Sequence, residues 1–306
     1  MIVSRRPTWW LASTLALFAA TLSVPAHAAP PCDELGKACP LPFNAETPRG
    51  AALGTGQRAS AISSSALAYN PAGLVLGKLY HIEGLVDYMV DMKTVALGGA
   101  VIDSATSKVG AGISLRGFLG SGGIGGIDGR LGLAFPFSEA VSIGVTGRYM
   151  NISDDTPVVD GVARSARLAK GFTMDASLRV APVPQVQLNI ASYNFINLES
   201  AYAPILVGGG GSFAIGEIAL IGADVITDLT SYKTADVTVG GGAEVFAART
   251  VPIRAGYSYE TKREQHTISF GLGYTDNSVG FDLSLRQQLG GAGDTRILGS
   301  FRFHVH

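Results

Sequence analysis

Long hydrophobic runs are scarce in this chain, although its overall composition is apolar. The mean hydropathy is +0.28, and 47% of the 306 residues are hydrophobic. Beyond residue 28, however, no apolar stretch approaches the roughly 18 residues that a membrane-spanning helix needs. The composition therefore argues against transmembrane helices in this part of the chain. The apolar residues must instead be spread periodically, and their period decides the fold class.

Charged residues are also few, at 15% of the chain, with 23 Lys and Arg against 24 Asp and Glu. No basic cluster suited to nucleic acid is present, so we expect no nucleic-acid partner. Only five histidines occur, and the sequence reveals no Ser or Asp partner for His81 or His266. The sequence thus predicts no enzymatic activity, no metal site and no cofactor.

The longest apolar stretch lies at the N-terminus. Arg5 and Arg6 precede WWLASTLALFAATLSV, and the sequence AHA at residues 26–28 fits a small-residue cleavage site. This pattern predicts a secretory signal peptide over residues 1–28, with an uncleaved membrane anchor as the alternative. Cleavage removes two arginines and no acids, which leaves 21 basic against 24 acidic residues and a net charge of −3.

Cysteine is nearly absent. The two cysteines, Cys32 and Cys39, closely follow the expected cleavage site. Exported proteins meet oxidising conditions, so this pair predicts one small disulfide loop. A metal site is the alternative, but no histidine lies near the pair in the sequence.

The hydrophobic period is two. In KGFTMDASLRV, apolar and polar residues alternate, which is typical of a strand with one apolar and one polar face. The apolar face holds Phe172, Met174, Ala176, Leu178 and Val180, and the polar face holds Thr173, Asp175, Ser177 and Arg179. About 14 segments of this kind occur, each of roughly ten residues, the length of a tilted membrane-spanning strand. Their ranges are 79–90, 93–102, 108–118, 127–136, 140–151, 171–181, 184–195, 205–215, 217–227, 235–247, 251–260, 265–275, 278–288 and 295–305.

These strands predict an all-β fold: a closed antiparallel transmembrane β-barrel over residues 79–306. Connections after even-numbered strands are short, whereas several after odd-numbered strands are longer, including 119–126 and 152–170. Outer-membrane barrels have this asymmetry, with the short turns facing the periplasm. Lipid offers no partners for backbone N–H and C=O groups, so a membrane-spanning sheet has to close. A soluble, secreted all-β domain is the alternative, but its polar faces would carry more Lys and Glu.

The polar strand faces of such a barrel point into the lumen. Charged residues on these faces are Arg116, Arg130, Arg148, Asp175, Arg179, Glu244, Arg254, Asp282, Arg286 and Arg302. One interpretation is a charged constriction that selects anionic solutes or ligand head groups. The other, which we favour, is a set of ion pairs that binds an N-terminal hatch in place.

Residues 29–78 lack the alternation. They hold the cysteine pair and a stretch of small residues that predicts a short helix ending at Asn70. A barrel of about 14 strands has a lumen too wide for its wall side chains to fill, so we expect this segment to plug the lumen as a hatch. Pro71 and Gly73 are then expected to form the corner where the hatch leaves the lumen and the first strand begins.

The stretch RGAALGTGQRASAISSSALAYNPAGL resembles the N-terminal segment of the long-chain fatty-acid transporter (FadL/TodX) family and its smaller PorV-like relatives. At the junction between hatch and barrel, the residues that match this pattern are Asn70, Pro71, Ala72, Gly73 and Leu74. A later stretch, IRAGYSYE, also resembles a strand of these proteins. The resemblance implies a 14-stranded outer-membrane barrel with an N-terminal hatch and, in the fatty-acid branch, passage of hydrophobic ligands.

These features predict an outer-membrane channel of a Gram-negative bacterium for hydrophobic or small amphipathic, fatty-acid-like solutes, gated by the hatch. The alternative is a non-transporting, PorV-like partner barrel that serves protein secretion or surface attachment. An outer-membrane enzyme is the third alternative. The expected partners are outer-membrane lipid, a hydrophobic small-molecule ligand, and the barrel-assembly machinery or a secretion partner.

Overall fold

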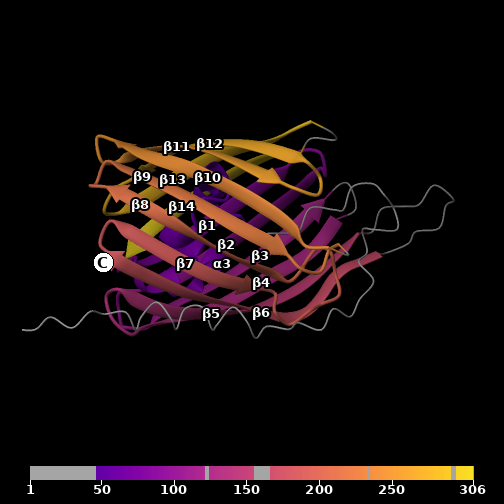
Figure 1. Cartoon of the computed structure of the whole chain (residues 1–306), viewed down its shortest axis with the longest axis horizontal. Coiled ribbons are helices and arrows are strands. Elements are labelled where there is room, and N and C mark those ends of the chain that lie inside the picture. The colour runs from indigo at the N-terminus through magenta and orange to yellow at the C-terminus, as the bar shows by residue number, and fades with distance from the viewer. Residues whose placement is uncertain (1–45, 121–123, 155–165, 233, 291–293, 306) are drawn as a thin grey trace, which may run out of the picture.

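Fourteen antiparallel strands form the wall of the molecule (Figure 1). The computed structural model describes residues 46–120, 124–154, 166–232, 234–290 and 294–305. The strands are β1 (Tyr80–Met89), β2 (Thr94–Asp103), β3 (Gly110–Gly120), β4 (Ile124–Pro136), β5 (Val141–Asp154), β6 (Ala166–Val183), β7 (Val186–Tyr193), β8 (Leu206–Ile215), β9 (Ala219–Asp228), β10 (Asp236–Ala247), β11 (Val251–Glu260), β12 (Gln265–Thr275), β13 (Val279–Leu289) and β14 (Thr295–Val305). Each strand pairs with its neighbours in sequence, and β1 also pairs with β14. The sheet therefore closes, which confirms the predicted barrel of fourteen strands.

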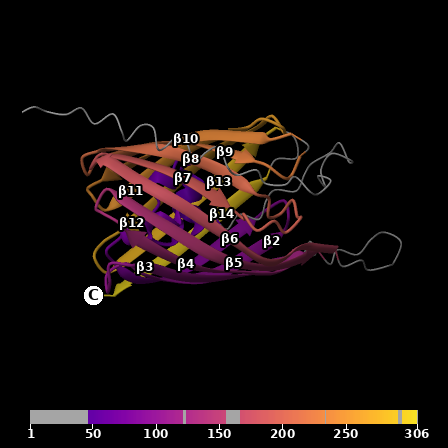
Figure 2. The same cartoon turned by 60° about the horizontal axis from the view of Figure 1, so that its bottom comes forward.

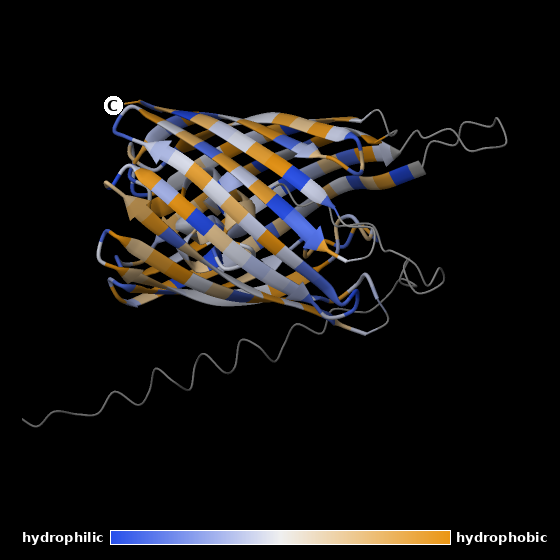
Figure 3. Cartoon of the chain, turned by 90° about the horizontal axis from the view of Figure 1, so that it is seen from above, coloured by the Kyte–Doolittle hydropathy of each residue, from blue (hydrophilic) through white to orange (hydrophobic). Residues whose placement is uncertain are grey.

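Alternating side chains give the wall an apolar outside and a polar inside. On β3, for example, the Leu115 side chain is 58% exposed, whereas the adjacent Arg116 is 5% exposed. Apolar and polar residues alternate along the strands in Figure 3. The outward residues meet no protein core, so their exposed apolar surface needs an apolar surrounding.

The strands β5 and β6 are longer than predicted, with 14 and 18 residues. They extend past the ends of the other strands (Figure 2) and occupy much of the predicted loop 152–170. The predicted loop 119–126 is likewise mostly strand. In these extensions the inward side chains Ile124, Ile152 and Ala169 are apolar and buried. Apolar residues therefore occupy inward as well as outward positions there, and the alternation that marks a strand is lost from the sequence.

From residue 46 onward, where the structure describes the chain, four short helices precede the barrel strands: α2 (Pro48–Ala52), the 3-10 helix η2 (Arg58–Ser60), α3 (Ser63–Tyr69) and the 3-10 helix η3 (Pro71–Val75). Thr47 caps α2, because its side chain accepts a hydrogen bond from the backbone N–H of Gly50, and Pro48 suits the first helical turn. None of the described helices is long and apolar enough to cross a membrane.

Residues 46–79, which we call the inner segment, run inside the barrel (Figures 1 and 2). Helix α2 packs against β11 to β14, η2 against β7 to β9, and η3 against β3 to β6. The predicted signal peptide and the Cys32–Cys39 pair lie outside the described residues, and both stay predictions.

Candidate functional site

The inner segment approaches the barrel wall most closely at glycines of neighbouring strands. A Cβ atom added to Gly256 on β11 would lie 2.2 Å from the backbone N of Gly54 and 2.3 Å from the carbonyl C of Leu53. A Cβ atom at Gly242 on β10 would lie 2.5 Å from the carbonyl O of Leu53. Such distances leave no room for a side chain. These wall positions therefore accept only glycine while the inner segment is in place.

We expect Gly256→Ala to destabilise the folded protein by about 1–3 kcal/mol, because the added methyl group collides with fixed backbone atoms. Gly117→Ala on β3 is the matched control, since a Cβ atom there meets nothing within 4 Å. This control should change stability by less than about 0.5 kcal/mol. Denaturant unfolding of the detergent-solubilised barrels measures the change in stability for both substitutions. Equal effects of the two substitutions would contradict the close packing of the inner segment.

An ion-pair network joins helix α2 to four wall strands, β10, β11, β13 and β14. Arg49 Nε lies 3.1 Å from Glu244 Oε2, and Arg49 Nη2 lies 3.1 Å from Oε1. Glu244 also pairs with Arg254, whose Nη1 lies 2.5 Å from Asp282 Oδ1. Asp282 accepts a further hydrogen bond from Arg302 Nη2 at 2.5 Å. Each carboxylate in the network is therefore shared by two arginines, and one of these arginines comes from the inner segment.

A second network holds the first described residue of the inner segment. The Glu46 carboxylate pairs with Arg286 and lies 3.5 Å from Arg296, which also pairs with Asp87. Burial alone would raise the pKa of the Glu46 carboxyl, but Arg286 and Arg296 together outweigh burial and hold its pKa below the ordinary value. Glu46 is thus ionised and fixed between two cations.

Arg58 anchors helix η2 to the opposite part of the wall. Its backbone N–H donates to Asp224 Oδ2 at 2.9 Å, and its Nη1 lies 3.2 Å from the same oxygen. Its guanidinium donates from Nε to the Tyr193 hydroxyl at 3.1 Å and sits 5.7 Å from the ring centroids of both Tyr69 and Tyr193. This buried arginine is therefore compensated by a carboxylate and two aromatic rings.

A further cluster links wall strands to one another. Arg148 Nη2 lies 2.7 Å from Asp128 Oδ2, and Arg148 Nη1 donates to Asn194 Oδ1 at 3.1 Å. Arg130 lies 3.6 Å from Asp128 and 3.9 Å from Asp175. It also donates to the carbonyl O of Ala68 in helix α3 at 3.2 Å. The cluster is thus mainly a bond between β4, β5 and β6, with one contact to the inner segment.

The ten predicted lumen charges fall into several groups. Those that the structure brings together are Glu244, Arg254, Asp282 and Arg302 in one network and Arg130, Arg148 and Asp175 in another. Arg286 pairs with Glu46. Arg179 lies apart and donates to the Gln187 side chain at 3.0 Å, while Arg116 is buried at 5% exposure.

In the networks described above, seven residues are not among the predicted lumen charges: Glu46, Arg49, Arg58, Asp87, Asp128, Asp224 and Arg296. Four of them are wall residues that strand alternation could have identified. Asp128, for example, follows the outward Ile127, which is 41% exposed. The other three lie in the inner segment, where no periodic signal identifies the residues that face the wall.

The predicted corner at the junction residues differs from the structure. Pro71, Ala72, Gly73 and Leu74 do not turn into a strand but form the buried 3-10 helix η3, and the first strand begins only at Tyr80. Gly73 is needed for close approach, because a Cβ atom there would lie 2.1 Å from the carbonyl O of Ala61. The prediction of a corner was wrong because proline at the first position of a helix favours a new helical turn, and Pro71 begins η3 in this way.

Asn70 ends helix α3 and ties the two halves of the inner segment together. Its Nδ2 donates to the carbonyl O of Arg58 at 2.8 Å. At the other end of α3, Ser63 Oγ lies 2.5 Å from His81 Nε2, a partner for this histidine that the sequence did not reveal.

Among the described residues, no three His, Cys, Asp or Glu side chains are grouped so that they could hold a metal ion.

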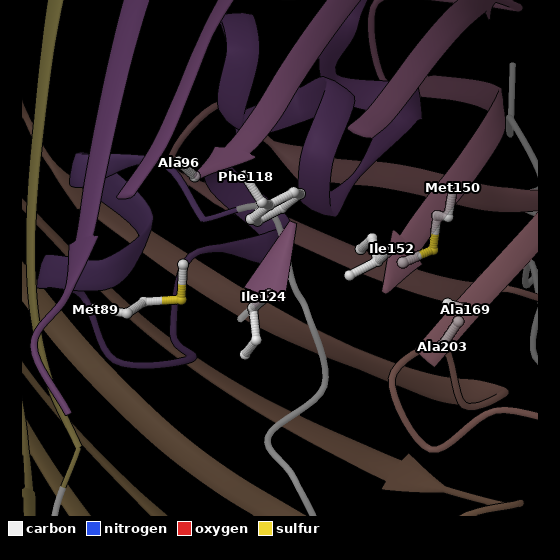
Figure 4. Close-up of a cluster of buried hydrophobic side chains, with 8 residues drawn as sticks. All are labelled: Met89, Ala96, Phe118, Ile124, Met150, Ile152, Ala169 and Ala203. Carbon is white, nitrogen blue, oxygen red and sulfur yellow. The ribbon is translucent and has the colours of Figure 1, made fainter. Parts of the chain in front are cut away.

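A half-open pocket of about 130 Å³ lies at the barrel end where the odd-numbered strands finish. Its floor is the inner segment, including Glu46, Thr55, Gln57 and Tyr69, and its walls come from β8 to β14. At the same end, on the side of β1 to β6, buried apolar side chains form a second feature (Figure 4). This apolar cluster comprises Met89, Ala96, Phe118, Ile124, Met150, Ile152, Ala169 and Ala203.

The fold of the chain has counterparts among solved structures. The chain matches the monoaromatic hydrocarbon channel CymD with a TM-score of 0.66 at 13% identity, covering 85% of this chain and 97% of that one. It matches the toluene transporter TbuX of Ralstonia pickettii with a TM-score of 0.61 at 13% identity, covering 86% and 99%. A FadL homologue of Pseudomonas aeruginosa gives 0.59 at 10% identity, covering 85% and 98%.

The chain has the fold of these channels. At identities this low the likeness concerns the fold, and it extends over nearly the whole length of each counterpart. No protein-family profile matches the sequence, and no curated protein matches it.

Proposed function

We propose that this protein is an outer-membrane channel of a Gram-negative bacterium for hydrophobic or small amphipathic solutes, and that the inner segment acts as its hatch. The observation that carries the proposal is a closed barrel with an apolar outer surface and a lumen occupied by residues 46–79.

Two further observations support hydrophobic or amphipathic cargo. The apolar cluster around Phe118 and Met150 lies at the same barrel end as the pocket, so the interior of this end of the barrel is partly apolar. Solved structures of this fold are named as channels or transporters of toluene and other monoaromatic hydrocarbons. The charged networks do not provide an open anion constriction, because their arginines pair with carboxylates.

The test is uptake of radiolabelled toluene by Gram-negative cells that produce the protein, compared with the same cells without it. We expect the protein in the outer-membrane fraction, with different gel mobility before and after boiling, and uptake that rises several-fold. An outer-membrane barrel that leaves uptake unchanged would contradict the channel. Purification of such a barrel with a stoichiometric protein partner would then favour the partner-barrel function.

A further inference from the structure

Uncharged polar side chains form one wall of the pocket at the end of the barrel. Ser258 lies opposite Thr267 in the register of β11 and β12, and Thr267 lies opposite Gln288 on β13. Thr238 on β10 also lines the pocket. Opposite residues of neighbouring antiparallel strands are about 5 Å apart. These four residues, which we call the polar row, therefore present hydroxyl and amide groups side by side.

The polar row has hydrogen-bonding capacity that the protein does not use. Among the described residues, the hydroxyls of Thr238, Ser258 and Thr267 have no hydrogen-bond partner. Ser258 is only 5% exposed and Thr267 only 4%. Their hydroxyl oxygens are nevertheless not enclosed, in contrast to Thr55 Oγ1 and Gln57 Oε1 on the floor of the pocket. Because a hydroxyl both donates and accepts, the row suits a ligand whose own groups do both.

The charged side chains around the pocket are already compensated. Among the described residues they comprise four acids and four arginines: Glu46, Asp228, Asp236, Glu260, Arg58, Arg263, Arg286 and Arg296. The arginines pair with carboxylates of the barrel or the inner segment. Asp228 and Asp236 accept hydrogen bonds from backbone N–H groups of nearby loops, at 2.9 and 2.8 Å. An ionic ligand would lose hydration here without meeting an unbalanced opposite charge, which favours an uncharged ligand.

The size and the remaining surface of the pocket restrict the ligand further. The volume is about 130 Å³, whereas a single ordered water needs only about 10–15 Å³. Tyr69 and Tyr232 add aromatic rings to the lining. A sugar ring matches both kinds of surface, because hydroxyl groups surround its edge and C–H groups make its faces apolar.

We propose that this pocket binds one sugar ring through the polar row, with a C–H face of the ring against Tyr69 and Tyr232. The ring belongs to a free saccharide or to the head group of a glycolipid, since both present the same hydroxyl groups. The proposal goes beyond the proposed function, because a polar site beside the inner segment does not require that hydrophobic solutes pass the barrel. Toluene uptake and sugar binding can therefore fail separately.

The experiment is equilibrium dialysis of the full protein in a detergent without a sugar head group, with detergent micelles alone as the blank. The probes are the methyl glycosides of glucose, galactose and mannose, and the analogues are glucuronate, glucosamine and cyclohexanol. We expect at least one methyl glycoside to bind roughly tenfold more tightly than the analogues. Glucuronate and glucosamine bring a charge, and cyclohexanol leaves most of the polar row without a partner.

Equal binding of glycosides and analogues would overturn the proposal, and so would tighter binding of any analogue. Absence of glycoside binding would also overturn it and would mean that the pocket holds only water. The hexyl glycoside of the best sugar identifies the source of the ring. Binding about tenfold tighter than that of the methyl glycoside indicates a glycolipid head group, whereas equal binding indicates a free saccharide.

Two variants locate the site. Ser258→Ala and Thr267→Val each remove a hydroxyl of the polar row with little change in side-chain volume, and each should weaken glycoside binding several-fold. Thr146→Val is the matched control, because the Thr146 hydroxyl is likewise buried without a partner but does not line the pocket. Altered gel mobility after boiling verifies that each variant has folded. Glycoside binding that is the same in all three variants would overturn the assignment to this pocket.

Discussion

Deletion of residues 46–70 is expected to raise the single-channel conductance in planar bilayers on the order of tenfold, because an emptied fourteen-stranded lumen admits water and ions. The barrel should still form. Its strand pairing is continuous from β1 to β14 without the inner segment, and the wall charges released by the deletion, such as Glu244 and Asp224, would be solvated by the incoming water. Altered gel mobility after boiling verifies that the deleted protein has folded.

A double substitution provides an intermediate test that keeps the chain complete. Arg49→Gln with Arg58→Gln removes the two ion pairs that fix α2 and η2 to Glu244 and Asp224. We expect frequent brief openings in place of a permanently high conductance, because the segment is loosened but remains in the lumen. A folded deletion variant with unchanged conductance would show that the inner segment serves folding or export and does not close the channel.

The extent to which the sequence predicts this structure depends on the range of each interaction. Strand alternation is local, so Leu115 and Arg116 could be assigned to opposite faces from their neighbours alone. The extensions of β5 and β6 escaped prediction because Ile152 on β5 and Ala169 on β6 are apolar residues on the inward face. The lumen is apolar at this end of the barrel, so the sequence pattern no longer distinguishes the inward face of a strand from its outward face.

The candidate site depends on longer-range contacts. Arg49 and Glu244 are 195 positions apart, and Arg58 and Asp224 are 166 apart. Either arginine could pair with any inward carboxylate of the wall until the path of the inner segment is known. The requirement for glycine at positions 242 and 256 is also a long-range effect. A side chain is excluded at these two positions only because the backbone of Leu53 and Gly54 passes close to them. Sequence reasoning could therefore predict ion pairs with a hatch, but not which residues form them.

Asp128→Asn is expected to cost about 3–5 kcal/mol of stability, more than the glycine substitution at position 256. Asp128 is 1% exposed and lies between Arg148 and Arg130, so its neutralisation leaves two buried guanidinium groups with less negative charge to balance them. The change keeps the shape of the side chain, so loss of packing contributes little. Denaturant unfolding in detergent micelles measures the loss.

The control for Asp128→Asn is a solvent-exposed ion pair of the same barrel. Arg249 and Glu217 lie 3.7 Å apart with side chains 83% and 79% exposed, and Glu217→Gln should cost less than about 1 kcal/mol. Adding Arg148→Met to Asp128→Asn should restore part of the lost stability, since a buried pair replaced by apolar groups is less costly than a pair broken on one side. If Asp128→Asn and Glu217→Gln cost the same, water must screen Asp128 and Arg148 within the lumen. The cluster between β4, β5 and β6 would then be part of a wet channel wall and not of a dry core.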